Sequence, residues 1–169
     1  TMAAHFRKNR IHKIYSAILS QHLPQISKHT VPEVYISLPI GQDLHSKIRI
    51  KQSVNPQGRP CQTYFREIKR IGDFSLVEVR PFTGRTHQIR VHAAHMGCAV
   101  VGDKLYGLPN DGFIHWLSEG DAFLRTQNFP LHRQLLHAVE IRFPHPLTRE
   151  ETIIRAADKI LLKELKDCG

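Results

Sequence analysis

The residues of this sequence best suited to chemistry lie in one stretch, Val79–Gly107, where arginines and histidines gather around a Thr-Gly pair. No Asp or Glu occurs in residues 81–102, so Arg80, Arg85 and Arg90 have no acid within that stretch to neutralise them. A guanidinium without an acidic partner, held at a rigid turn, is suited to bind a carboxylate or a phosphate. The stretch therefore predicts an anion-binding site centred on Arg85.

Histidines in the same stretch raise the alternative of a metal site. The candidate ligands are His87, His92, His95 and Cys98. Their spacing on a helix does not bring three imidazoles together, and no carboxylate or second cysteine completes a ligand set. We therefore expect no metal here, and we expect His87 and Gln88 to donate hydrogen bonds that hold the turn.

The elements expected to position Arg85 are a strand and a short helix. The β-type run Phe74–Arg80 leads into a Pro and then a Thr-Gly pair, where a strand should end. Thr86 is expected to cap the helix and Gly97 to end it. The apolar positions of this helix, at i, i+4 and i+7, are Ile89, Ala93 and Met96. Arg85 should therefore lie at the turn between the two elements.

Two blocks of the stretch, T-G-R-T-H-Q-I-R-V-H and V-G-D-K-L-Y-G, closely resemble the signature of the RluA-type RNA pseudouridine synthases. The resemblance continues in S-L-V-E-V-R-P, in H-K-I-Y-S-A-I-L and in L-L-H-A-V-E-I-R-F-P-H-P-L-T, so it covers the chain from about Met2 to Arg155. It implies an enzyme that isomerises uridine to pseudouridine in rRNA or tRNA, with no cofactor. The base must leave its helix or loop to be reached.

The resemblance also implies roles for individual residues. Arg85 matches the arginine that pairs with the catalytic aspartate, and Tyr15 in K-x-Y-x-A matches the tyrosine that stacks on the target base. Leu136 in L-L-H-A matches a position that packs near the base. The further substrate-binding candidates are His87, Gln88 and Arg90.

Each of these residues also has a plain structural interpretation. Without the family match, Arg85 could merely tie two loops together, and Tyr15 and Leu136 could be ordinary core residues. Asp103 is the only acid near the motif, but the resemblance implies a structural aspartate at that position.

The family's catalytic aspartate lies in an Arg-Leu-Asp stretch followed by Thr-Ser-Gly, and neither occurs in this sequence. In the family, that stretch precedes the helix that leads into K-x-Y-x-A, and Met2–Asn9 fits the last turns of this helix. We therefore expect residues 1–169 to be a single partial catalytic domain that lacks the amino-terminal part with the nucleophile. Two functions stay open: a synthase whose aspartate another stretch supplies, and a catalytically inactive RNA-binding remnant.

The remaining segments predict an α+β fold, a mixed and mainly antiparallel sheet with a few helices. The expected strands are Ile11–Ser20, Val34–Leu38, Lys47–Lys51, Leu135–Phe143 and Thr152–Ala156, with a hairpin of Gln62–Lys69 and Phe74–Arg80. Pro109–Pro130 shows no clean period and is expected to be irregular, and Ala157–Leu165 is expected to form a short amphipathic helix.

Size and charge fit this interpretation. The 169 residues suffice for one domain, and the net charge of +9 favours a polyanionic partner, most simply RNA. A solvated basic face without a partner, on an unrelated domain, is the alternative that charge alone leaves open. The 3 cysteines are scattered and odd in number, which favours free thiols in a reducing compartment. No apolar run is long enough to span a bilayer, and no secretory leader pattern is seen at Thr1. We expect a cytoplasmic monomer with no membrane segment.

Overall fold

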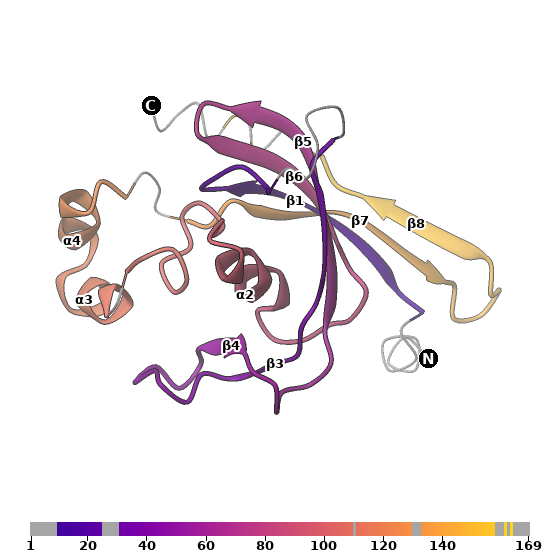
Figure 1. Ribbon diagram of the computed structural model, residues 1–169. Coiled ribbons are helices and arrows are strands. Elements are labelled where there is room, and N and C mark those ends of the chain that lie inside the picture. Colours follow the sequence, from indigo (N-terminus) through magenta and orange to yellow (C-terminus); the bar gives the residue numbers. More distant parts are fainter. Residues whose placement is uncertain are drawn as a thin grey trace.

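The centre of the molecule is a six-stranded sheet in the order β2-β5-β6-β1-β7-β8 (Figure 1). The computed structural model describes residues 10–24, 31–109, 111–129, 133–157, 161 and 163. The six strands are β1 (His12–Leu19), β2 (Glu33–Ser37), β5 (Gln62–Ile71), β6 (Phe74–Pro81), β7 (Leu136–Pro144) and β8 (Glu151–Arg155). Each described pair of neighbouring strands runs antiparallel. The predicted α+β fold with a mainly antiparallel sheet is confirmed.

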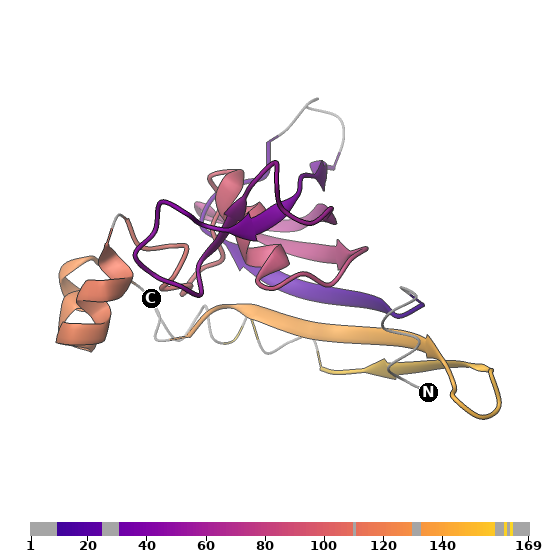
Figure 2. The same cartoon turned by 90° about the horizontal axis from the view of Figure 1, so that it is seen from below.

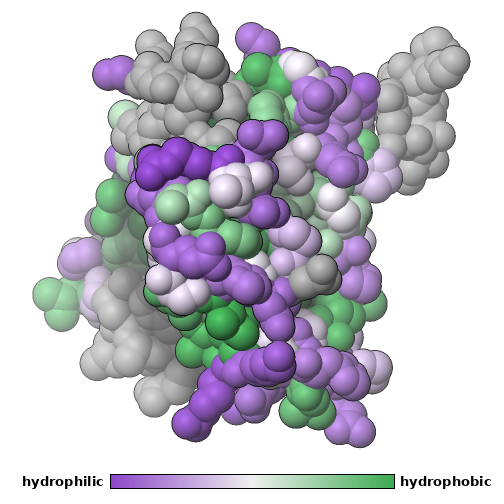
Figure 3. All heavy atoms as spheres, turned by 90° about the vertical axis from the view of Figure 1, so that its left-hand side faces the viewer, coloured by the Kyte–Doolittle hydropathy of each residue, from purple (hydrophilic) through white to green (hydrophobic). Residues whose placement is uncertain are grey.

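Smaller elements surround one side of the sheet. Helix α2 (Gln88–His95) lies between the sheet and a separate two-stranded arm, β3 (Ile40–Gln42) and β4 (Gln52–Val54) (Figure 1). Helices α3 (Gly112–Glu119) and α4 (Asp121–Thr126) form one end of the molecule. Figure 3 looks at that end, where hydrophilic and hydrophobic atoms are interspersed. Of the described helices, none is long and apolar enough to cross a membrane.

The main core lies between α2 and the facing side of the sheet. Alternate residues of β5 and β6 point to this side, and Phe65, Val77 and Val79 are completely buried there. They pack in one cluster with Ile89 and Ala93 of α2. The alternation that predicted the β5–β6 hairpin therefore also attaches the helix that follows it.

Strand β1 is buried on both faces of the sheet. Ala17 and Leu19 belong to the core beneath α2, whereas Ile18 packs on the opposite face with Leu135 and Leu161. This placement explains why the end of β1 carries a continuous apolar run instead of an alternating one. The strand is central in the sheet, and Figure 2 shows it running beside β7 toward the β7–β8 hairpin.

Three predictions about elements are wrong. Lys47–Lys51 forms turns between β3 and β4 instead of a strand, and its Ile50 is 58% exposed. Within Pro109–Pro130, the described residues form the helices α3 and α4 instead of irregular chain. The N-cap of α2 is His87 and not Thr86.

Two other predictions fall wholly or largely outside the described residues. Met2–Asn9 lies outside them entirely. Of the predicted Ala157–Leu165 helix, Leu161 and Lys163 are described as helical, and Leu161 is fully buried.

Candidate active site

All six residues predicted for the site line a single pocket of about 150 Å³, which we call the Tyr15 pocket. They come from the middle of β1, the turn after β6, the start of α2 and the start of β7. These residues are Tyr15, Arg85, His87, Gln88, Arg90 and Leu136. Burial raises the pKa of the Tyr15 phenol, so the side chain is a neutral ring at physiological pH. No acid belongs to the described lining of this pocket.

The Thr-Gly-Arg turn is held from inside by Gln88. Gln88 is 4% exposed, and its Oε1 accepts hydrogen bonds from the Thr83 hydroxyl at 2.9 Å and the Arg85 backbone N–H at 3.0 Å. Its Nε2 donates to the Gln62 carbonyl at 2.8 Å and to Thr63 Oγ1 at 3.0 Å. All four hydrogen-bonding positions of the amide are thus filled by the chain itself. This geometry supports the predicted turn-holding role of Gln88 and leaves its amide no position for a substrate.

A buried histidine extends this network to the loop after β2. His92 is 0% exposed, and its Nε2 donates to the Leu38 carbonyl at 3.1 Å. Its Nδ1 lies 2.8 Å from the Thr63 hydroxyl, which donates to it because burial lowers the pKa of His92 and keeps the ring neutral. His92 is therefore a core histidine that fixes Thr63 for Gln88. No group of metal-binding side chains occurs among the residues that the structure describes.

His87 adopts a backbone conformation that residues other than glycine rarely take. Its φ is 55°, in the left-handed region, at the N-cap of α2. Its Nδ1 lies 2.9 Å from the Tyr106 hydroxyl, which also accepts the Gln52 backbone N–H at 3.0 Å. Burial and the Arg90 cation lower the pKa of His87, and burial raises the pKa of Tyr106 to about 12. Neutral His87 and neutral Tyr106 thus share one hydrogen bond, and this bond fixes the turn.

The second motif block packs beneath the first through a buried ion pair. Asp103 is 1% exposed and accepts hydrogen bonds from Arg90 Nε at 2.6 Å and Arg90 Nη2 at 2.7 Å. It also accepts the backbone N–H groups of Leu105 and Tyr106. The Arg90 guanidinium lies over the Tyr106 ring, 4.9 Å from its centroid. This supports the structural role expected of Asp103.

The expectation that three arginines lack acidic neighbours is wrong for two of them. Arg80 Nη2 lies 2.7 Å from Glu78, two residues earlier on β6, and Arg90 pairs with Asp103 in the loop after α2. Arg85 Nε donates to the Pro60 carbonyl at 3.1 Å, and no described acid forms an ion pair with its guanidinium. The two Nη groups are therefore the part of Arg85 that remains for a ligand.

Sequence reasoning missed one charged residue of the pocket, Lys13. Lys13 lies two residues before Tyr15, so both side chains are on the same face of β1, and it belongs to the lining. Its Nζ is 3.3 Å from the place that a Cβ on Gly84 would occupy. Lys13 is the lysine of the K-x-Y-x-A motif, so the motif itself could have indicated that this residue belongs to the site.

Comparisons with known proteins agree with this geometry. The family model described as RNA pseudouridylate synthase matches residues 1–95. An uncharacterized RNA pseudouridine synthase of Chloroflexus aurantiacus is 37% identical over 162 residues, which are 94% of this chain and 43% of that protein. Ribosomal large subunit pseudouridine synthase C of Vibrio cholerae is 33% identical over 155 residues, 92% of this chain and 43% of that protein.

A solved structure is similar as well. Human RNA pseudouridylate synthase domain containing 1 superposes with a TM-score of 0.70 at 27% identity, over 96% of this chain and 60% of that one. The chain therefore belongs to the RNA pseudouridylate synthase family, and its RluA-type resemblance is confirmed. It spans less than half the length of the curated relatives named above, 43% of each.

Proposed function

We propose that this chain is part of an RNA pseudouridine synthase and supplies the base-stacking and cationic sides of its active site. The observation that carries the proposal is the Tyr15 pocket, which joins Tyr15, Arg85 and Leu136 from three separate elements. The reaction breaks the bond between N1 of uracil and C1′ of ribose, turns the base over, and joins C5 to C1′. The C5 proton leaves, N1 gains a proton, and no electron acceptor is needed.

Each residue has a defined task in this proposal. The Tyr15 ring supports the uracil by stacking, and Leu136 provides an apolar wall. The Nη groups of Arg85 bind and orient a carboxylate in two-pronged fashion. Gln88 and Arg90 act as positioning residues, because the chain's own groups already engage Gln88 Nε2 and the Nε and Nη2 of Arg90. The target nucleotide enters after leaving its stack, since the glycosidic bond is otherwise covered.

The carboxylate that Arg85 serves is proposed to come from another stretch of protein. No acid is part of the described pocket lining, and Asp103 is fully used by Arg90 and two backbone N–H groups. The 169 residues also contain no Arg-Leu-Asp sequence. The partial-domain expectation thus remains a proposal, and so does the second function, an inactive RNA-binding remnant with the same pocket.

The proposed substrate is ribosomal RNA. Relatives are named ribosomal large subunit pseudouridine synthases C and D, and this is the reason to favour rRNA over tRNA. The chain's net charge of +9 supports an RNA partner of either kind.

Arg85→Lys, in the protein extended to include an Arg-Leu-Asp stretch, tests the assignment. Lysine keeps the charge but loses the planar grip, so turnover should fall more than about tenfold while RNA affinity changes much less. The control is Arg66→Lys on β5, where Arg66 is 45% exposed and lies 3.9 Å from Glu33. Turnover in Arg85→Lys within a few-fold of the parent would remove Arg85 from its proposed role.

A further inference from the structure

Lys13 lies where two hollows of the surface meet. One is the Tyr15 pocket, and the other is a hollow of about 540 Å³, which we call the strand gap. The β1–β6 pairing ends at Tyr15 and Val79, whereas β1 continues beside β7 to His12. The strand gap therefore opens where β1 and β6 part, and Lys13 and Pro81 line both hollows.

The Lys13 ammonium is half-buried and without a described partner. Burial lowers its pKa, and among the described residues it forms neither an ion pair nor a hydrogen bond. The other cations of the strand gap are paired, Arg80 with Glu78 and Arg142 with Glu140. A partly desolvated cation without an anion carries a free-energy cost that a bound anion would offset.

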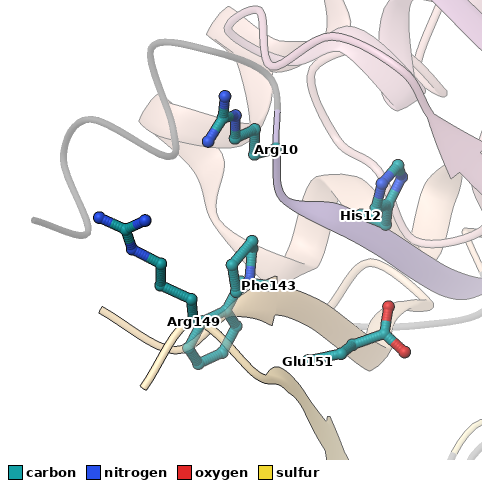
Figure 4. Close-up of a pocket in the computed structure, with 6 residues that line it drawn as sticks. Arg10, His12, Phe143, Arg149 and Glu151 are labelled. Carbon is teal, nitrogen blue, oxygen red and sulfur yellow. The ribbon is translucent and has the colours of Figure 1, made fainter. Parts of the chain in front are cut away.

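Two more cations without a described acidic partner lie further along the same side of β1. The strand gap shares His12 and Glu151 with a hollow of about 300 Å³, which we call the hairpin-end hollow. Its lining includes Arg10 and Arg149, and neither forms an ion pair with a described residue. Figure 4 shows both guanidinium groups on one side of Phe143, with the Glu151 carboxylate on the other.

We propose that Lys13, Arg10 and Arg149 bind backbone phosphates of one single-stranded RNA segment, which runs from the nucleotide in the Tyr15 pocket through the strand gap to the hairpin-end hollow. The proposal rests on the function proposed above. Its ligand is the phosphodiester group, a singly charged anion that repeats along an RNA strand and so matches separate cations on β1 (Lys13), just before it (Arg10) and in the β7–β8 turn (Arg149). The bases carried by this segment need not be recognised.

The test measures how RNA affinity depends on salt. The 169-residue chain and three variants, Lys13→Met, Arg149→Met and the exposed control Lys69→Met, are titrated against a fluorescein-labelled oligouridylate at about 50 to 200 mM KCl. Each lost phosphate contact should reduce the slope of log K against log salt by about 0.7. We expect this reduction for Lys13→Met and Arg149→Met and none for Lys69→Met. A fourth variant that combines Lys13→Met with Arg149→Met should show the sum of the two reductions. Thermal melting checks that every variant is folded.

The outcomes separate a failure of the phosphate track from a failure of the proposed function. If the parent chain binds RNA but Lys13→Met and Arg149→Met have the same slope of log K against log salt as Lys69→Met, the phosphate track is overturned. The proposed function is then left intact. Equal slopes are also the result expected if the natural partner of Lys13 is a protein carboxylate. A parent chain that binds no oligouridylate at low salt would overturn the track together with the RNA-binding part of the proposed function.

Discussion

Asp103 is the residue on which the two motif blocks converge. Its carboxylate joins Arg90 of the first block to the backbone of the second, and its side chain is 0% exposed. Arg90 in turn covers the ring of Tyr106, whose hydroxyl holds His87. The turn that carries Arg85 is thus supported, through Tyr106 and His87, by the Asp103–Arg90 charge pair.

Asp103→Asn should be strongly destabilising. The amide keeps the shape of the carboxylate but leaves the mostly buried Arg90 guanidinium without its counter-charge, and breaking a buried pair in this way costs about 3–5 kcal/mol. Urea denaturation followed by circular dichroism measures the change.

Asp111→Asn is the matched control for this substitution. Asp111 meets Lys47 at 3.2 Å, but the two side chains are 53% and 76% exposed, so the loss should be below about 1 kcal/mol. Equal losses in the two variants would show that the Asp103–Arg90 pair does not support the site.

At the scale of elements, a second buried carboxylate fastens the β5–β6 hairpin to the chain that leaves β1. Glu67 on β5 is 6% exposed and accepts the Ser75 hydroxyl at 2.6 Å and Arg70 Nε at 2.6 Å. The Leu23 backbone N–H, beyond the end of β1, also donates to it at 3.3 Å. Burial alone would raise the pKa of Glu67, but these hydrogen bonds outweigh it, so the pKa lies below the usual 4.5.

This carboxylate predicts a pH dependence of stability. Because the pKa of Glu67 is lower in the folded state, its contribution is complete above about pH 4.5 and is lost as the pH falls through the folded value. Glu67→Gln should therefore be less stable than the parent at neutral pH, and the difference should shrink in acid. Denaturation series across this pH range, with the exposed Glu150→Gln as control, measure it. A difference that is constant with pH would show that Glu67 titrates alike in both states.

Sequence patterns predicted the elements that alternate or repeat over a buried face. The β5–β6 hairpin, β7 and β8, and the strand–turn–helix around Arg85 all follow from such patterns. Lys47–Lys51 also alternates, but Ile50 remains exposed, so alternation without a face to bury does not make a strand.

The pairing of charges was the part of the site that sequence could not supply. Arg80 pairs with Glu78 and Arg90 pairs with Asp103, both outside residues 81–102, and Lys13 has no acidic partner among the described residues. The Arg90–Asp103 pair depends on a tertiary contact between α2 and a loop, which a local count of acids does not contain. Tertiary contacts also decide that Gln88 holds the turn instead of facing a substrate.

At the scale of the whole molecule, the sheet, the Tyr15 pocket and the proposed phosphate track together form the surface that we propose for a nucleotide and its strand. The central claim is that this surface serves pseudouridine formation when a carboxylate joins it. Tritium release from RNA whose uridines carry tritium on C5 tests this claim, because the reaction replaces that C5–H bond by C5–C1′. Unmodified ribosomal RNA is the substrate, and folding is checked by circular dichroism.

Two proteins are compared in this measurement, the 169-residue chain and the protein extended upstream through an Arg-Leu-Asp stretch. We expect release by the extended protein and none by the 169-residue chain, since catalytic groups that act as a unit fail together when one is missing. A folded, RNA-binding extended protein that releases no tritium would favour the inactive remnant. Release by the 169-residue chain alone would contradict the account, and Asp103 would then be the first residue to substitute.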